Sequence, residues 1–424
     1  MIKFLLKGLL RDRSRSLFPV LVVVAGVALT VLGYCWIKGA QNEMVSGSAH
    51  FSHGHVKIMT QAYAREADQV PNDLGLVNVA SLLEDLNAEY PDMIWLPRIQ
   101  FGGLLDIPDE NGETRAQGPV VGMAIRLFDE ESPERNILNL DNSLVSGRFP
   151  DKSGEILISD AFAKKLGVAI GETATLIGSS AYGGMAMSNF RVVGTLRFGV
   201  AVLDRGAMVA DVSDIQYTLD MPDGAGEILG FFEDDIYDDK QAHQIAAEFN
   251  EAHLQPADEF SPVMKTLREA SGVAYMLDMT KGIFTAMILL FVFVMSMVLW
   301  NAGLISALRR YGEIGVRLAI GEDKGHIYRA MLAEALMIGI IGSALGTLLG
   351  LAASYYLQTK GIDISGMMQN ASMILSNVMR ARVTPVAFIV GFLPGLMATL
   401  LGTAIAGIGI YKRQTSQLFK ELEV

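Results

Sequence analysis

The feature that most restricts how this chain can fold is a set of four long apolar segments. They span residues 17–37, 283–308, 330–357 and 386–411. A helix needs roughly 20 apolar residues to cross the hydrocarbon core of a bilayer, and each segment reaches that length. Residues 40–280, between the first two segments, have the mixed composition of a folded domain. The sequence therefore predicts a membrane protein with four transmembrane helices and a large domain outside the membrane.

The first segment is predicted to be an uncleaved anchor. Residues 1–16 carry five basic side chains interspersed with leucine and phenylalanine, which is typical of an amphipathic elbow helix on the cytoplasmic membrane surface. The following run, 17–37, is longer than the apolar part of a signal peptide, the alternative considered, and no small-x-small cleavage site follows it. The single cysteine, Cys35, lies in this run after Tyr34, which argues against a lipoprotein signal and excludes a disulfide within the chain.

Lysine and arginine predict the orientation of the chain. Five lie before the first segment, five between 309 and 329, three in the tail 412–424, and three in the loop 358–384. Positive charge near membrane helices marks the cytoplasmic side. Both termini and the loop 309–326 are therefore predicted to be cytoplasmic. The domain 40–280 and the loop 358–384 are expected outside the inner (plasma) membrane.

The large domain is predicted to be acidic and of mixed α/β structure. Residues 40–280 hold 38 acidic and 16 basic residues, so they carry a net charge of −22. A domain of this charge has no basic patch for phosphates, which argues against nucleic acid as a partner. Alternating and helical patterns predict a β-rich subdomain, about 140–222, inserted in an α/β one. A helix is expected over 261–281, continuous with the second membrane segment.

Catalytic and metal-binding patterns are weak in this sequence. His50, His53 and His55 follow one another at short spacing, and on a strand the last two would share a face. No carboxylate or cysteine lies close to them, so a strand entering the domain is favoured over a metal site. The sequence has no nucleotide-binding, zinc-protease or nucleophile-elbow motif. We therefore expect a chain that is not an enzyme and binds no cofactor of its own.

A short charged segment between the second and third membrane segments is the main candidate site. Leu308, Tyr311, Ile314, Gly315 and Leu318 fall on one helical face. The opposite face carries three charged residues four positions apart, in a pattern that lets the central glutamate pair with both arginines: Arg309, Glu313 and Arg317. Gly321 marks the end of this predicted helix. An isolated cytoplasmic helix with such a face is typical of a docking element.

Two further features lie in the third segment. Gly342, Gly346 and Gly350 are four residues apart, a spacing that lets helix backbones approach closely in lipid. They predict a packing ridge whose partner is left open. Glu334 lies near the cytoplasmic edge, where an ion pair with Arg309, Arg310 or Arg329 is favoured over a proton relay.

The segment Arg310-Tyr-Gly-Glu-Ile-Gly-Val-Arg-Leu-Ala-Ile-Gly321, followed by residues 327–335, resembles the signature of the FtsX-like or MacB-type permease family. Gly54-His-Val-Lys-Ile58 and Gly147-Arg-Phe149 also resemble the family's extracytoplasmic domain. The chain departs from the family pattern at Ile320 and at Glu322, where a small residue is usual. The resemblance extends over nearly the whole chain.

The resemblance implies a permease subunit of a type VII ABC transporter. Two permeases, identical or paralogous, would bind a pair of cytoplasmic ATPase subunits that hold the ATP and magnesium. The coupling site would comprise a set of seven residues on or beside the segment just described: Arg309, Arg310, Glu313, Ile314, Arg317, Leu318 and Gly321. The glycine ridge would contribute to contact between the permeases. The membrane helices would carry ATP-driven motion outward, in contact with membrane lipid, rather than form a wide channel.

Several functions stay open at this level. The extracytoplasmic residues favour the lipoprotein-releasing LolC/LolE-like branch, with a lipoprotein or another periplasmic partner, over drug efflux of the MacB type. A mechanotransmitter that regulates an extracytoplasmic enzyme or sensor is an alternative, and so is an ATPase-independent receptor. Copurification of an ATPase with the chain would exclude the ATPase-independent receptor function.

Overall fold

The structure is a computed structural model that describes residues 13–129, 132–199, 202–269, 273–308, 311–363 and 378–412. The chain forms two compact units. The membrane unit contains residues 1–41, 280–362 and 379–424, and the extracytoplasmic unit contains residues 42–279 and 363–378. Most of the predicted elbow helix, nearly all of the predicted tail and residues 364–377 of the predicted external loop lie outside the described residues.

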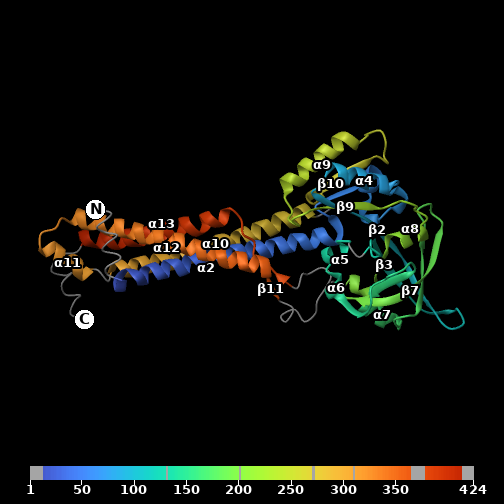
Figure 1. The fold of residues 1–424 in the computed structure, drawn as a ribbon, viewed down its shortest axis with the longest axis horizontal. Helices are drawn as coiled ribbons and strands as arrows, with labels where there is room; N and C mark the ends of the chain where they lie inside the picture. The colour runs from blue at the N-terminus through green and yellow to red at the C-terminus, as the bar shows by residue number, and fades with distance from the viewer. Residues whose placement is uncertain are drawn as a thin grey trace. The chain divides into compact units, whose positions relative to one another are not determined.

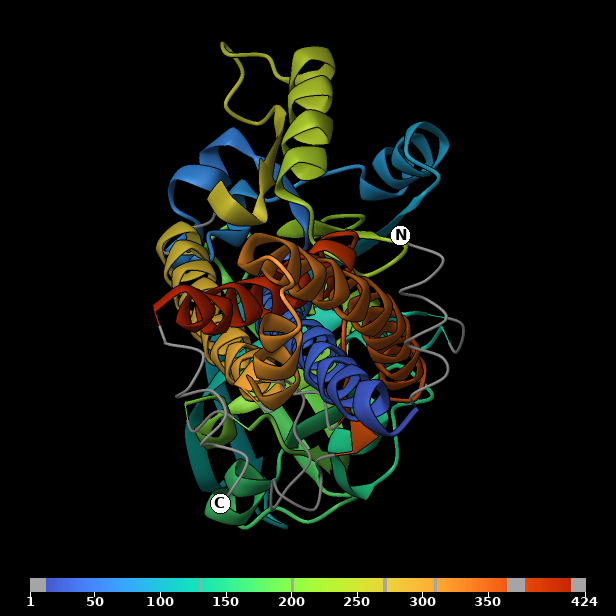
Figure 2. The same cartoon turned by 90° about the vertical axis from the view of Figure 1, so that its left-hand side faces the viewer.

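In the residues that the structure describes, the membrane unit contains four long helices and one short helix, which can be followed in Figure 1. They are α2 (Arg13–Ser48), α10 (Val273–Leu308), α11 (Tyr311–Ala319), α12 (Lys324–Lys360) and α13 (Val386–Lys412). The four long helices are long and apolar enough to cross a membrane, as the sequence predicts. Figure 2 shows them approximately end-on. A short pair of strands, β11 (Ile362–Asp363) and β12 (Val378–Met379), lies between α12 and α13 in the sequence.

The extracytoplasmic unit is built on one continuous ten-stranded sheet. Its strands are β1 (Val56–Thr60), β2 (Met93–Pro108), β3 (Thr114–Ile125), β4 (Leu144–Gly147), β5 (Glu155–Ser159), β6 (Thr173–Ser179), β7 (Met185–Leu196), β8 (Ala207–Asp211), β9 (Glu227–Phe232) and β10 (Pro262–Thr266). Its helices are α3 (Gln61–Arg65), α4 (Val79–Glu89), α5 (Glu134–Ile137), α6 (Leu140–Ser143), α7 (Asp160–Leu166), α8 (Val212–Thr218) and α9 (Asp239–His253). A π-helical turn, η1 (Ala49–His53), follows α2, and short 3-10 turns occupy 67–69, 72–74, 203–205 and 267–269.

Strand β2 belongs to two subdomains at once. Its first half, Met93–Arg98, pairs with β9 in the open sheet β10-β1-β9-β2. Its second half pairs with β3 from Ile99 onward and with β6 at 103–106. The further pairings β3–β8, β8–β5, β5–β7 and β7–β6 bring the chain of strands back to β2. These six strands therefore form a closed β-barrel.

The barrel is larger than the predicted inserted subdomain. Its strands include β3 and half of β2, which precede residue 140, whereas its last strand, β8, ends at Asp211 within the predicted range of 140–222. The predicted return to the α/β subdomain is present, because β9 pairs between β1 and β2. The boundary differs because a strand shared between two subdomains has no loop or change in composition at the point of transition.

The helix expected over 261–281 is wrong in its first half. Residues 262–266 form β10, which pairs antiparallel with β1 so that Met264 lies opposite Ile58. Met264 and Thr266 are buried while Val263 and Lys265 are half-buried, which is the alternation of an edge strand. Asn250 of α9 bonds both the N–H and the C=O of Met264 through its side chain. Helix α10 begins only at Val273.

Candidate coupling site and the packing of the membrane helices

Helix α11 packs its apolar face against the long helices of the membrane unit. Ile314 is 3% exposed and lies in a cluster with Ile327 and Met331 of α12 and Ala406 of α13. Leu304 of α10 and Leu318 of α11 pack against the same cluster. The predicted amphipathic helix is present, and its apolar face contacts three membrane helices. This cluster therefore joins α11 to α12 and α13, with Leu304 of α10 packed against it.

The C-terminus of α11 is closed by a Schellman motif. The N–H of Glu322 donates to the carbonyl of Arg317, and the N–H of Gly321 donates to the carbonyl of Leu318. Gly321 has φ +98°, the left-handed conformation that glycine adopts without steric cost. The next residue but one, Asp323, caps α12 by accepting bonds from Gly325 N–H and His326 N–H. Only a short turn therefore separates the two helices, and side-chain and backbone bonds fix its ends.

An ion pair spans this turn and involves Glu322, one of the two residues where the sequence departs from the family pattern. The Arg317 guanidinium donates from Nε and Nη2 to the two carboxylate oxygens of Glu322, both at 2.7 Å. A Schellman motif usually has an apolar contact between these two positions. Here a bidentate ion pair takes its place, which a small residue at 322 could not form. The other departure, Ile320, is 81% exposed, and Val316 beside it is 45% exposed.

The other predicted coupling residues are described only in part. Arg309 and Arg310 lie outside the described residues, and the structure describes the backbone of Glu313 but not its side chain. The predicted pairing of Glu313 with both arginines therefore stays a prediction. Glu334 is half-buried in α12, and its ion pair with Arg309, Arg310 or Arg329 also stays a prediction.

The glycine ridge of α12 packs on the first membrane helix of the same chain. A methyl group at Gly342 would lie 2.7 Å from Val23, and one at Gly346 would lie 2.7 Å from the carbonyl oxygen of Val24. At Gly350 it would meet Val31 and the carbonyl of Ala28 at similar distances. These distances are shorter than contacts between carbon or oxygen atoms allow. The ridge therefore has an intramolecular partner, α2, which the sequence left open.

Helix α13 brings a second set of glycines to the same place. A methyl group at Gly391 would meet Val31 and Thr347, and one at Gly395 would meet Val27 and Ser343. Helices α2, α12 and α13 thus approach one another closely through small residues on two helices. This packing role of Gly391 and Gly395 was not predicted from the sequence, although their four-residue spacing matches that of the ridge.

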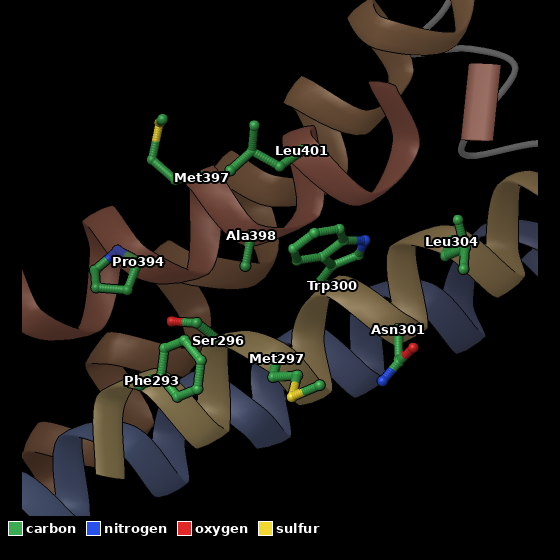
Figure 3. Close-up of a pocket in the computed structure, with 10 residues that line it drawn as sticks. All are labelled: Phe293, Ser296, Met297, Trp300, Asn301, Leu304, Pro394, Met397, Ala398 and Leu401. Carbon is green, nitrogen blue, oxygen red and sulfur yellow. The ribbon is translucent and has the colours of Figure 1, made fainter. Parts of the chain in front are cut away.

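An apolar groove between α10 and α13 was also missed (Figure 3). Its volume is about 480 Å³. The residues that line it are Phe293, Ser296, Met297, Trp300, Asn301 and Leu304 of α10, and Pro394, Met397, Ala398 and Leu401 of α13. In Figure 3 the indole of Trp300 lies between the two helices, toward Ala398 and Leu401. Pro394 lies inside α13, and a proline within a helix is a sequence signal for a local irregularity of the helix.

His53 and His55 do not share a strand face, because neither lies in a strand. His53 ends the π-helical turn η1, Gly54 follows with φ +63°, and β1 begins at Val56. His55 Nδ1 accepts a bond from the N–H of Phe232, and His50 Nε2 contacts Asp235 at 2.6 Å. Within the described ranges, no group of three or more His, Cys, Asp or Glu side chains is placed to hold a metal ion.

Family comparisons agree with this architecture. A model described as MacB-like periplasmic core domain matches residues 16–249, more than half of the chain, and one described as FtsX-like permease C-terminal matches residues 285–415. The chain belongs to the MacB-type, FtsX-like family of ABC transporter permeases. A MacB-type permease carries a periplasmic-type domain on membrane helices, which is the division that the two units show.

Individual relatives match over a limited region. Macrolide export ATP-binding/permease protein MacB of Rhodopseudomonas palustris (strain HaA2) is 33% identical over 105 residues, 24% of this chain and 15% of that protein. The proteins of the same name from Brucella abortus (strain 2308) and Campylobacter jejuni (strain 81-176) are 34% and 35% identical over 106 and 101 residues. The matched region thus spans about 15% of the length of these relatives.

A solved structure, the periplasmic region of MacB from Actinobacillus actinomycetemcomitans, is similar over 50% of this chain and 87% of that one. The TM-score is 0.33 and the sequence identity is 12%.

Proposed function

We propose that this chain is the permease subunit of an ABC transporter and that it transmits motion from a separate cytoplasmic ATPase to its extracytoplasmic unit. The observation that carries the proposal is the packing of α11. One face of this helix is fixed on α10, α12 and α13, while Val316 and Ile320 are exposed beside it. These two side chains offer an apolar contact for the ATPase, framed by the ion pair of Arg317 and Glu322.

Continuous helices give the motion a path. Both α2 and α10 run without interruption from residues of the membrane unit into residues of the extracytoplasmic unit. A helix held by intrahelical hydrogen bonds along its whole length moves as a stiff element. The chain itself performs no catalysis in this proposal. ATP and magnesium bind to the partner ATPase, and both termini of this chain are cytoplasmic.

A second permease, identical or paralogous, completes the membrane part of the transporter. The exposure of helix α10 supports this. Of the most apolar stretch of α10, 11% is buried, whereas 33–44% of the corresponding stretch is buried in each of the other three membrane helices. The uncovered surface of α10 contacts either the second permease or membrane lipid.

Two substrate classes fit the proposal. One is a lipoprotein or related amphipathic molecule, released from the outer face of the membrane. The other is a small amphipathic molecule exported by efflux, which the names of the matching relatives support. Regulation of an extracytoplasmic enzyme or sensor is the non-transporting alternative. Purified transporter in proteoliposomes, offered a fluorescent lipopeptide and a macrolide in parallel, distinguishes these outcomes.

Copurification tests the coupling role directly. We expect Ile320→Asp and Val316→Asp to reduce the amount of ATPase that copurifies with the permease, and to reduce permease-dependent ATPase activity at least tenfold, because a charge replaces an apolar contact. Tyr217→Asp, a change at a highly exposed position in the extracytoplasmic unit, is the control and should leave both unchanged. Full retention of ATPase by both α11 variants would show that docking occurs elsewhere.

A further inference from the structure

Arg98 lies at the residue where strand β2 leaves the open sheet and enters the barrel. It is the last residue of β2 that pairs with β9, opposite Glu227, and Ile99 is the first that pairs with β3, opposite Ala124. Its side chain is 2% exposed and is the largest among the fully buried side chains. Arginine is almost never buried to this extent unless all of its charge is paired. The position and burial together indicate a specific role.

The guanidinium group of Arg98 joins three separate segments. Nε and Nη2 donate to the two carboxylate oxygens of Glu134, at 3.2 and 2.8 Å, and Glu134 is itself fully buried in α5. Nη1 donates to the backbone carbonyls of His50 and Phe51, both at 2.8 Å. These carbonyls belong to η1, the turn that directly follows α2. Arg98 thus binds the end of α2, the strand shared by both subdomains, and α5.

The end of α2 needs such a partner. The last carbonyls of a helix have no intrahelical donor, and buried carbonyls without a donor are destabilising. Gly54 N–H satisfies the carbonyl of Ala49, and Arg98 satisfies the next two. His50 is also held from its side chain by Asp235, at 2.6 Å. The turn is therefore held by directional bonds rather than by packing alone.

The two helices that continue from the membrane unit meet one patch of the open sheet. Ala49 of η1, with Val273 and Leu277 of α10, packs in a cluster with Leu96 of β2 and Leu229 of β9. This cluster is apolar and lies on the open sheet. Apolar contacts extend this hold further, because Ile137 of α5 packs against the same cluster and Phe51 of η1 packs against the apolar cluster of the barrel. Arg98 adds the directional bonds, which join η1 to Glu134 at the start of α5.

Stability alone does not explain a buried ion pair here. Apolar residues of similar volume often replace such a pair with no loss of stability, or with a gain. What apolar residues cannot reproduce is a bond of fixed direction to two specific carbonyls and one specific carboxylate.

We propose that Arg98 is a positioning residue that makes the barrel follow displacements of the end of α2. The proposal rests on the mechanotransmission function proposed above. When the end of α2 shifts, the carbonyls of η1 pull on the guanidinium, and the bidentate bond to Glu134 passes the shift to α5 and the barrel. Without Arg98, the open sheet still follows the helices through its apolar cluster. The barrel then keeps only the non-directional apolar contacts of Phe51 and Ile137, which allow it to tilt about Arg98–Ile99 of β2.

The test uses the complete transporter, permease with its ATPase, in lipid nanodiscs. Spin labels are placed at Met44→Cys on α2 and Lys165→Cys on α7 of the barrel, both exposed, in a Cys35→Ser background. The distance between the labels is measured by double electron–electron resonance without nucleotide and with a non-hydrolysable ATP analogue. Three variants are compared with the spin-labelled protein that has no further substitution. They are Arg98→Met with Glu134→Leu, Arg98→Lys, and the control Arg115→Met with Glu172→Leu.

We expect a narrow distribution that shifts with nucleotide in the unsubstituted protein and in the control, whose ion pair is an exposed one within the barrel region. The double variant of Arg98 and Glu134 should fold, retain ATPase activity within about twofold, and show a distribution at least twice as broad that no longer shifts. Arg98→Lys keeps the charge but loses the fork of donors, so its distribution should be intermediate. A purely structural role would lower thermal stability without this selective broadening.

Two outcomes separate the inference from the function on which it rests. If the apolar double variant keeps both the nucleotide-dependent shift and the original width, the role of Arg98 is refuted. If even the unsubstituted complex shows no shift, the proposed function fails. In that case the role of Arg98 is judged from the width of the distance distribution measured without nucleotide. If this width is the same in the double variant as in the unsubstituted protein, the role of Arg98 is refuted.

Discussion

The guanidinium of Arg317 and the carboxylate of Glu322 are joined by two hydrogen bonds of 2.7 Å across the turn at Gly321. Both side chains are partly exposed, at 44% and 27%, so the pair adds little to overall stability. Its effect is local, because it fixes the end of α11 relative to the start of α12. A helix whose end is fixed in this way is displaced as a unit, whereas a helix whose last turn unwinds absorbs part of the displacement.

Gly321 provides the first test of that arrangement. Gly321→Ala introduces no contact within 4 Å, but it forces an L-residue to adopt φ +98°, which costs about 1–2 kcal/mol. We expect the end of α11 to loosen and permease-dependent ATPase activity to fall severalfold. Gly282→Ala is the matched control, since it is equally uncrowded but lies within helix α10. ATPase assays on both purified complexes are the measurement, and equal activities would contradict the expectation.

Gly346 tests the ridge of α12. Gly346→Val places its Cβ 2.7 Å from the carbonyl oxygen of Val24, with backbone on one side and Val27 on the other. We expect α2 and α12 to separate and the thermal midpoint of the detergent-solubilised protein to fall by 5 °C or more. Leu348→Ala, on an exposed part of the same helix, should change it by less than 2 °C. If the two variants melt together, α2 is not the partner of the ridge in the folded protein.

His55 predicts a pH dependence of the extracytoplasmic unit. Burial lowers the pKa of His55 to about 4, against about 6.5 in an unfolded chain, although Asp235 opposes the shift. The unfolded chain therefore binds more protons between these values. The contribution of neutral His55 is complete above about pH 6.5 and is lost as the pH falls toward 4. The loss amounts to about 3 kcal/mol when both states are protonated.

Melting experiments between pH 7 and pH 4.5 measure this loss. We expect the thermal midpoint, followed by tryptophan fluorescence, to drop with falling pH in the natural protein. His55→Gln keeps an acceptor for the N–H of Phe232 but does not titrate, so its drop should be smaller. Parallel curves for the two proteins would assign the pH dependence to other groups.

Arg148 and Glu155 predict a second loss of stability with falling pH, at lower pH than that of His55. Two bonds from the Arg148 guanidinium lower the pKa of the buried Glu155 carboxyl to about 2, against the effect of burial. This carboxylate therefore stabilises the fold above about pH 4.5, and the contribution is lost as the pH falls through 2. Arg148→Met removes the cation and leaves burial to raise the pKa.

The variant should be clearly less stable than the natural protein at pH 7. The difference should narrow as the pH is lowered toward 4.5, because protonation relieves the unpaired carboxylate. Arg148→Lys keeps the charge with fewer bonds and should lie between the two. Urea unfolding at pH 7 and pH 4.5 makes the comparison, and a difference that is independent of pH would rule out Glu155 as the cause.

Apolar length and helical periodicity were sufficient to predict the membrane helices and α11. Both signals are local: roughly 20 apolar residues for a span, and the spacing of Ile314 and Leu318 for an amphipathic face. The end of α11 was equally predictable, because Gly321 follows its last apolar turn. These features need no knowledge of distant parts of the chain.

Contacts between residues far apart in the chain could not be predicted from the sequence. The five residues of β10, taken alone, are as compatible with a helix as with a strand, and only their pairing with β1 identifies them as a strand. The partner of the Gly346 ridge could not be chosen among three other membrane helices of similar composition. Arg98 went unnoticed, because a lone arginine in an apolar run gives no sign that two carbonyls and a carboxylate, 36 to 48 residues away, converge on it.

The double membership of β2 also limits how this protein can be recombined with its relatives. A chimera that exchanges the barrel must be cut between Arg98 and Ile99, inside a continuous strand, and again before β9. Insertion of a single residue at the first cut would turn every following side chain of β2 to the opposite side of the sheet. Barrel and open sheet are therefore expected to be inherited together.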